Sequence, residues 1–219
     1  MKRFAAYPLL VAGCSGPLST LEPGGPAAAD IAWLWWGMLA GAAVITVFMV
    51  GLVLLALGAP RPVREGRWTL GLGLGLSMVI LVPVLAAGLW VGERIIPRDD
   101  GVVTVEAHAW QWNWRFTHAD AEGAPVESEN TLHIPAGQPV DVLITSEDVI
   151  HSFWVPRLAG KLDAIPGRTN RARIMADEPG RYAGLCAEFC GQGHARMRFD
   201  VVAHADWPPV LNGDGTEAE

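Results

Sequence analysis

Cysteine and charge are both scarce in this chain of 219 residues. It has three cysteines, Cys14, Cys186 and Cys190, too few for a disulfide scaffold. Charged residues make up only 18%, and the net charge of −7 argues against a general nucleic-acid binder. A phosphate-binding loop is also missing, because the run GLGLGL from Gly71 lies inside an apolar stretch and not between a strand and a helix. What remains to be explained first is the apolar half of the chain.

Two long stretches without charge predict a pair of transmembrane helices, over residues 31–57 and 68–92. A helix needs about 20 apolar residues to cross the hydrocarbon core of a bilayer, and both stretches reach that length. The predicted loop between them, residues 58–67, carries three arginines and one glutamate, Glu65. The positive-inside rule places this loop in the cytoplasm, so both chain ends lie outside.

The first 13 residues have the form of a secretory signal peptide. Lys2 and Arg3 precede an apolar stretch, and the segment VAGC then places small residues before Cys14. This end resembles a bacterial lipobox, which would make Cys14 a lipid anchor; an apolar leader with an incidental cysteine is the alternative. Residues 14–30, rich in Pro, Gly, Ser and Ala, are predicted to be a flexible linker.

Residues 99–206 predict an all-β domain outside the membrane. Short β-rich stretches alternate with Pro, Gly, Asp and Asn, which is typical of a Greek-key sandwich of about 100 residues. Residues 98–219 hold 10 Lys or Arg against 19 Asp or Glu, a net charge of −9, and an acidic tail is expected over residues 207–219. An acidic domain attracts a basic partner, although solubility is the simpler explanation of this charge.

The segment GLCAEFCGQGHARM concentrates metal-binding side chains: Cys186, Cys190, His194 and Met197. A disulfide between cysteines four residues apart is sterically possible in an oxidising compartment, but it leaves the histidine and the methionine unused. Zinc accepts cysteine and histidine, whereas methionine is a poor zinc ligand. Copper is soft enough to bind thiolate, thioether and imidazole together.

A second histidine favours two copper ions over one. The segment SEDVIHSFWVP supplies His151 from an earlier strand. A single blue-copper site takes one thiolate, two histidines and an axial methionine, so one of the two cysteines would be surplus. In a copper pair both thiolates bridge, each ion takes one histidine, Met197 caps one ion and the backbone carbonyl of Glu188 caps the other. We therefore predict an electron-transfer site without an open position, with a structural zinc or a disulfide as alternatives.

Three motifs resemble subunit II of haem-copper cytochrome c oxidase: SEDVIHSFWVP, KLDAIPGR and CAEFCGQGHARM, in this order behind two spans. The resemblance covers nearly all of the chain after the leader. It implies two transmembrane helices followed by an all-β cupredoxin-like Greek-key sandwich with a binuclear CuA centre. The implied ligands are His151, Cys186, Glu188 through its carbonyl, Cys190, His194 and Met197. The Glu188 side chain would also meet a magnesium ion at the interface with subunit I.

Other positions have roles that only this resemblance implies. AHAWQWNWRF is similar to the aromatic patch that receives electrons from cytochrome c, and Trp110 matches its electron-accepting tryptophan. Gln111 departs from the family, which often has a second aromatic residue there. Glu147 and Asp148 match acidic positions near the cytochrome-docking face, where a solvated turn is the alternative. Glu65 matches the glutamate at the entrance of a proton path in subunit I, and a plain surface charge is the alternative.

The predicted function is that of subunit II of a proton-pumping terminal oxidase in the bacterial inner membrane. Electrons from cytochrome c would reach the copper pair on the periplasmic side and pass to haem in subunit I, where oxygen is reduced; subunit III is an expected further partner. A quinol-oxidase subunit II lacks the copper ligands, and a nitrous-oxide-reductase copper domain has no paired spans. A membrane-anchored copper-delivery protein is an alternative from another class.

Overall fold

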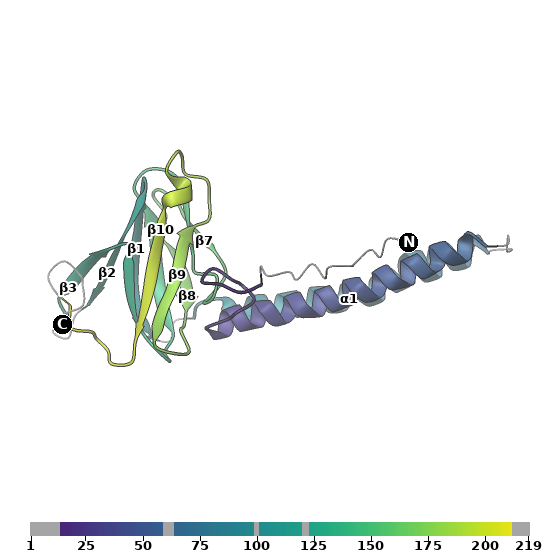
Figure 1. Ribbon diagram of the computed structural model, residues 1–219, viewed down its shortest axis with the longest axis horizontal. Helices are drawn as coiled ribbons and strands as arrows, with labels where there is room; N and C mark the ends of the chain where they lie inside the picture. Colours follow the sequence, from purple (N-terminus) through teal and green to yellow (C-terminus); the bar gives the residue numbers. More distant parts are fainter. Residues whose placement is uncertain (1–13, 59–63, 99–100, 120–122, 212–219) are drawn as a thin grey trace, which may run out of the picture. The chain divides into compact units, whose positions relative to one another are not determined.

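The computed structural model describes residues 14–58, 64–98, 101–119 and 123–211. The predicted leader, residues 1–13, lies outside the described residues, as do the last eight residues of the predicted tail. The chain divides into two compact units, a helical unit of residues 29–96 and a β unit formed by the rest (Figure 1).

The helices are α1 (Pro26–Ala56), whose first three residues belong to the β unit, the π-helical η1 (Arg67–Leu76) and α2 (Ser77–Ile95). Both helical stretches are long and apolar enough to cross a membrane, by length and composition. The first begins at Pro26, five residues before the predicted span, because proline fits the first helical position, whose N–H needs no partner. The second continues to Ile95, beyond the predicted residue 92.

The winding of η1 differs from the predicted α-helix. Its sequence alternates glycine and leucine from Gly71 to Leu76. Glycine disfavours the α-helix because its backbone is the least restricted of all residues. A stretch that contains several glycines can therefore depart from α-helical to π-helical geometry at a lower cost than a leucine-rich stretch. The regular α-helix resumes at Ser77, where the alternation ends.

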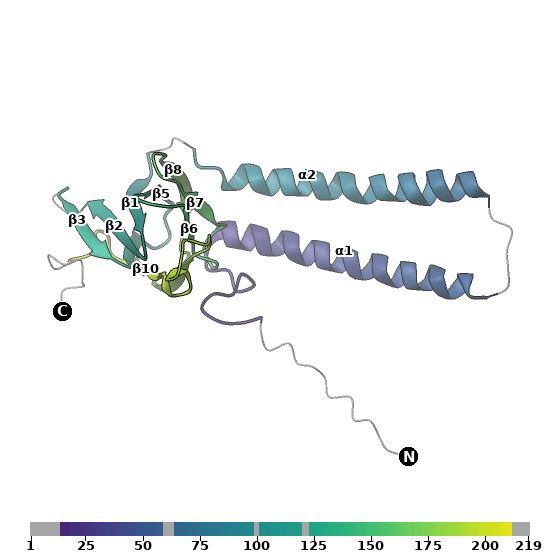
Figure 2. The same cartoon turned by 90° about the horizontal axis from the view of Figure 1, so that it is seen from above.

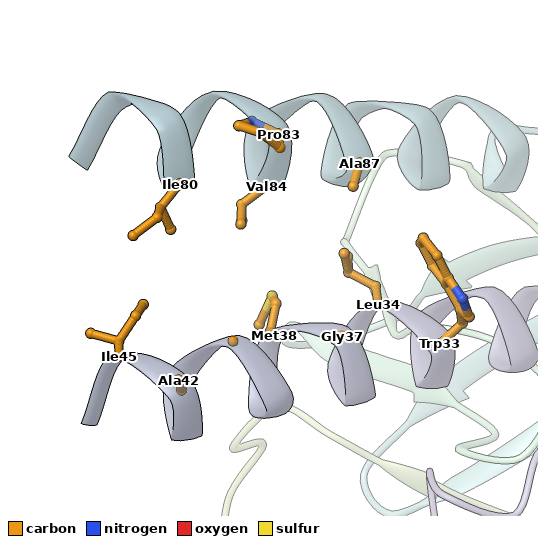
Figure 3. A pocket seen from close by; sticks show the side chains of 11 residues that line it. Trp33, Leu34, Gly37, Met38, Ala42, Ile45, Ile80, Pro83, Val84 and Ala87 are labelled. Atoms are coloured by element: carbon orange, nitrogen blue, oxygen red, sulfur yellow. The ribbon is translucent and has the colours of Figure 1, made fainter. Parts of the chain in front are cut away.

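One end of the helical pair is held by polar and aromatic contacts. Asp30 on α1 pairs with Arg94 on α2, with 2.8 Å between Oδ2 and Nε. The rings of Trp33 and Trp90 meet edge to face with 6.3 Å between centroids, and the Arg94 guanidinium lies over Trp90. Figure 2 shows α1 and α2 side by side. Between them lies an apolar cavity of about 490 Å³ (Figure 3), lined by residues that include Met38, Ile45, Ile80, Val84 and Ala87.

The β unit is a sandwich of two five-stranded sheets. The first has the order β3-β2-β1-β5-β8, formed by Pro125–Glu129, Asn113–Ala119, Val103–Trp110, Val140–Ser146 and Asn170–Ile174. The second has the order β4-β10-β9-β6-β7, formed by Thr131–Pro135, Arg198–His204, Gly180–Cys186, His151–Trp154 and Leu162–Ala164. A short 3-10 helix, η2 (His194–Arg196), precedes β10.

The chain crosses repeatedly between the two sheets, which gives the sandwich its Greek-key character. Strands β1 and β5 pair in parallel within the first sheet, and β4 and β10 do so within the second, while the other pairs are antiparallel. Long connections are required between parallel neighbours, so the connections cross from sheet to sheet. The predicted fold class, two long apolar helices followed by a cupredoxin-like sandwich, is confirmed.

Aromatic side chains fill the space between the sheets. Trp114 and Phe116 from β2 pack against Phe153 from β6 and Phe199 from β10, and all four are almost fully buried. Gly184 on β9 permits this, since a Cβ there would lie 2.3 Å from the Phe199 ring. Strands β6 and β9 pair with Phe153 opposite Cys186, and this brings the first residue of β6 close to the last residue of β9, with 3.9 Å between His151 Nδ1 and Cys186 Sγ.

The segment before α1 is attached to the β unit, although residues 14–30 were predicted to be a flexible linker. The Gly24 N–H donates to the carbonyl of Arg157 at 2.7 Å, and its carbonyl accepts from the N–H of Asp177 at 2.8 Å. The Arg157 guanidinium donates to the carbonyl of Glu22 at 2.8 Å. A Cβ on Gly24 would lie 2.5 Å from the Tyr182 ring, so the small residue that suggested flexibility serves close packing instead.

Candidate metal centre

The predicted copper ligands lie in or directly beside two connections of the β sandwich, the one before β6 and the one after β9. His151 is the first residue of β6, and the turn before it connects to β5. Cys186 is the last residue of β9, and Cys190, His194 and Met197 follow on the way to β10. Because β6 pairs with β9, these ligands come together although 35 residues separate His151 from Cys186.

The ligand atoms converge closely. The two thiol sulfurs lie 3.8 Å apart, Cys186 Sγ is 3.9 Å from His151 Nδ1, and Cys190 Sγ is 3.6 Å from His194 Nδ1. The Met197 sulfur lies 3.7 Å from Cys190 Sγ and 3.1 Å from His151 Nδ1. The donor atoms of His151, Cys186 and Cys190 all lie within 4.8 Å of one another. The structure therefore brings together the five side chains that the sequence predicted.

The two thiols are free and face each other without a bond between them. A disulfide has a sulfur–sulfur length of about 2.05 Å, far below the 3.8 Å seen here. Metal–thiolate bonds are about 2.3 Å long, so ions placed between the sulfurs could contact both. Two thiolates, two imidazoles and a thioether form a soft donor set that fits copper.

Glu188 presents its carbonyl and its carboxylate to different neighbours. The Cys186 sulfur lies 3.3 Å from the Glu188 carbonyl oxygen, so this oxygen faces the sulfur cluster. The half-exposed carboxylate lies 3.4 Å from the ammonium nitrogen of Lys161. Its carbonyl is therefore available to a metal at the centre, while its side chain points toward a charged neighbour.

The centre is almost closed to solvent. His151 is fully buried, and Met197, Cys186 and Cys190 expose 1, 2 and 3% of their surface. His194 is half-buried and contacts the ring of Phe189, with 5.7 Å between centroids. Phe189 is 78% exposed, which is unusual for a phenylalanine, and it lies between the two cysteines. An apolar side chain thus covers the half-buried ligand from the solvent side.

Burial and hydrogen bonding give the two thiols opposite acidities. Burial by itself raises the pKa of Cys186, but the His151 imidazole and backbone groups of Glu188 and Ser152 lower it to about 6. The pKa of Cys190 rises to about 12 because the thiol is buried and faces the charge of the Cys186 thiolate. Without metal, the pair thus holds a single thiolate over a wide pH range.

Asp148 fixes the orientation of the first histidine. One carboxylate oxygen accepts a hydrogen bond from His151 Nε2 at 2.8 Å, and the other accepts one from the N–H of Gln111 at 2.8 Å. Burial raises the pKa of Asp148, but these bonds and one from Val149 lower it overall. With its proton on Nε2, His151 turns the lone pair of Nδ1 toward the sulfurs. The sequence predicted Asp148 at the docking face, and it missed this contact.

The hairpin turn between β1 and β2 holds the ligand loop, a second contact that the sequence did not reveal. The carbonyl oxygen of Cys190 accepts from Gln111 Nε2 at 2.7 Å and from the Trp112 indole at 3.2 Å. A Cβ on Gly193 would lie 2.3 Å from the Trp112 ring, so the loop rests directly on the indole. No spacing in the sequence signals contacts between residues 78 and 79 positions apart.

The predicted docking residues lie on the same hairpin and the neighbouring turn. Trp110, at the end of β1, is half-buried, with the Arg115 guanidinium 5.2 Å from its ring centroid. Glu147 has a side chain that is 70% exposed, and His108 Nε2 lies 3.4 Å from its carboxylate. Trp110 and Glu147 therefore remain candidates for contact with a partner.

The two remaining predicted residues lie outside the metal centre. Glu65 is exposed, at the start of the helical stretch that leads into η1. Cys14 is exposed, and its carbonyl accepts a hydrogen bond from the Ser19 hydroxyl at 2.7 Å. Proton uptake at Glu65 and lipidation of Cys14 stay predictions.

Comparisons with known proteins find a matching family model and a similar curated protein. Residues 117–204 match the family model described as "Cytochrome C oxidase subunit II, periplasmic domain". Cytochrome c oxidase subunit 2 of Alkalihalophilus pseudofirmus is 31% identical over 217 residues, which cover 89% of this chain and 61% of that protein. The chain therefore spans a little under two thirds of this curated relative. It is related to cytochrome c oxidase subunit II, and the resemblance seen in its motifs is confirmed.

Two solved structures are also similar. The periplasmic domain of subunit II of cytochrome oxidase from Bradyrhizobium japonicum is 30% identical, with a TM-score of 0.46, and the match covers 51% of this chain and 89% of that one. A haem-copper terminal oxidase dimer includes a chain that is 25% identical, with a TM-score of 0.48, and there the match covers 61% and 98%.

Proposed function

We propose that this chain is subunit II of a proton-pumping terminal respiratory oxidase. It accepts electrons from cytochrome c at a binuclear CuA centre and passes them to haem in subunit I, where oxygen is reduced to water. The observation that carries the proposal is the pair of free, buried thiols 3.8 Å apart, faced by two imidazoles and a thioether. When bound, a copper pair supplies one-electron chemistry at this position.

The residues of the chain prepare the site for that chemistry. His151 presents Nδ1 because Asp148 holds Nε2, and this contact selects the tautomer that can bind a metal. The buried side chains of Met197 and the two cysteines exclude water, so the environment changes little between oxidation states. Every donor has a place in a closed ligand set, which suits electron transfer better than substrate chemistry.

The surface around the centre supports contact with partners. Phe189 and Ile150 are exposed apolar side chains beside the ligands, at 78 and 45%. Exposed apolar groups around a functional centre are typical of protein interfaces. We assign this surface to contacts with subunit I and with cytochrome c, the latter near Trp110 and Glu147; subunit III is a further expected partner. The Glu188 carboxylate would meet magnesium at the interface with subunit I.

The two apolar helices support a multi-pass position in a bacterial inner membrane, with the copper domain on the periplasmic face. In this arrangement Glu65 lies on the cytoplasmic side, where a proton path into subunit I would begin. Acylation of Cys14 would add a lipid anchor on the opposite side.

Copper stoichiometry tests the proposal. The purified full chain, loaded with copper, should hold about two ions per polypeptide and give an EPR spectrum of one electron shared by two coppers. Cys186→Ser should hold at most about one copper and lose that spectrum. Cys14→Ser is the matched control, because Cys14 is exposed and outside the centre, and it should behave like the wild type. A wild-type chain with one localised copper, or one that a chelator strips at once as from a delivery protein, would overturn the proposal.

A further inference from the structure

We propose that Gln111 is a positioning residue for the copper centre, binding both ligand-bearing connections from the hairpin turn between β1 and β2. The inference rests on the proposed function, since it concerns a centre that holds copper. Gln111 matters because this position departs from the aromatic residue often found in the resembling family, so its role belongs to this chain.

The first contact is to the cysteine loop. Gln111 Nε2 donates to the Cys190 carbonyl oxygen at 2.7 Å, which is the shorter of the two hydrogen bonds that this oxygen accepts. A carbonyl has two lone pairs, so Gln111 and the Trp112 indole can be accommodated together. Cys190 is 97% buried, whereas Gln111 itself is exposed and the bond between them is partly buried, so the amide reaches in from the surface to the backbone of a buried ligand.

The second contact is to the histidine turn. The main-chain N–H of Gln111 donates to Asp148 Oδ2, whose partner oxygen holds His151. One residue therefore binds the loop of one ligand directly and the turn of another through a carboxylate. The two ligands come from connections 39 residues apart, and Gln111 sets their positions with respect to each other.

The ligand loop is shaped to accept this contact. Gly191 has a φ of +118°, a conformation that side chains rarely adopt, and a Cβ there would lie 3.1 Å from Gln111 Nε2. The absence of a side chain at Gly191 lets the glutamine amide reach the backbone. A residue that served only to close the hairpin turn would not need this close approach from a loop 79 positions away.

The amide also places a positive dipole end near the centre. Reduction adds negative charge, and an N–H aimed at the backbone beside a ligand sulfur favours the reduced form; hydrogen bonding around ligand sulfurs is a known means of tuning potentials. Loss of this amide should therefore lower the reduction potential. Partners of metal ligands typically affect metal affinity by about 10- to 100-fold.

The test compares Gln111→Leu and Gln111→Glu with Gln192→Leu in the copper-loaded full chain. Leucine removes the donor, and glutamate keeps the shape but presents an acceptor at neutral pH. Gln192 is an exposed glutamine of the same ligand loop, so it is the matched control. Three quantities are measured: copper retention under a chelator, the EPR hyperfine pattern and the reduction potential.

Both Gln111 variants should lose copper about 10- to 100-fold more readily and show a changed hyperfine pattern and a lower potential, with glutamate the more severe. Gln192→Leu should match the wild type. A Gln111→Leu chain that unfolds like the wild type and keeps its retention, spectrum and potential would overturn this inference alone. If the wild type itself lacks the shared-electron spectrum, the proposed function fails instead. A change in unfolding without a change in spectrum or potential would show a purely structural role and also overturn the inference.

Discussion

The carboxylate of Asp148 accepts a hydrogen bond from Nε2 of His151 at 2.8 Å, which directs the other ring nitrogen toward the sulfurs. We expect Asp148→Asn to weaken copper retention by about 10- to 100-fold, because an amide oxygen is a weaker partner for the imidazole and the amide can turn its NH₂ toward it. Chelator competition measures this.

Glu147→Gln is the control for that change. It removes the same charge from the adjacent residue, whose side chain is 70% exposed, and should leave copper retention unchanged. If Asp148 acted only at the docking face, both variants would slow electron uptake from cytochrome c equally and neither would release copper. That result would refute the positioning role.

The contact of Gly193 with Trp112 predicts a steric cost. Gly193 has φ −88° and ψ 0°, a backbone conformation that alanine also adopts. A larger residue would therefore be disfavoured here only by steric clash. Since its Cβ would lie 2.3 Å from the indole, Gly193→Ala should lower the free energy of unfolding by about 1–3 kcal/mol and speed copper loss. Urea denaturation of the metal-free chain provides the first measurement. Gly88→Ala, where nothing lies within 4 Å of the added carbon, should show neither effect.

Two ion pairs of similar length should contribute differently to the free energy of unfolding, because one is buried and the other is exposed. Arg173 and Asp141 are 2.8 Å apart, with side chains 19 and 5% exposed, and Arg181 and Asp200 are 2.9 Å apart at 63 and 41%. Arg173→Met leaves a buried carboxylate with a weaker partner in Arg171, at 3.7 Å, so the loss should be on the order of 3 kcal/mol. Arg181→Met should cost about 0–1 kcal/mol. Equal losses in thermal or urea unfolding would contradict this reading of burial.

Copper uptake should weaken in acid. A metal that binds both sulfurs must displace the protons they carry. Above pH about 6 Cys186 is already a thiolate, because its pKa is lowered, whereas Cys190 keeps its proton up to a pKa of about 12. Apparent affinity should therefore rise with pH throughout this range and fall more steeply in acid, where Cys186 and also His151, whose pKa is lowered by burial but raised overall by Cys186 and Asp148, take up protons that a metal must displace.

Copper titrations between pH 5 and 8 would show this change of slope. The residual binding of Cys186→Ser should depend less steeply on pH in acid, since the thiol with a pKa of about 6 is removed while His151 remains. Uptake independent of pH would contradict the assignment of the protons.

Much of the metal centre was predictable from the sequence, because most of its ligand residues are of metal-binding types and lie close together in the chain. Cys186, Cys190, His194 and Met197 lie within 12 residues, and such a set is rare outside a metal site. The two helices were also predictable, since an uncharged apolar stretch of more than about 20 residues is typical of a membrane-spanning helix. Their ends were less so: α1 begins inside the predicted linker, and η1 is wound differently from the predicted α-helix.

The roles of Asp148, Gln111 and Trp112 depended on the tertiary structure. In the sequence, Asp148 is one acidic residue among many and Gln111 is a polar residue in an aromatic patch. Their contacts with His151 and Cys190 exist because the pairing of β1 with β5 and of β6 with β9 brings two turns to the same end of the sandwich.

By itself, the sequence determined which chemical groups are present and which segments avoid water, since both follow from the side chains themselves. The tertiary structure decided which nitrogen of His151 faces the sulfurs, how far apart the thiols lie and which neighbours hold their loops. These depend on strand register, because a shift of one residue in a strand would turn each of its side chains to the other face.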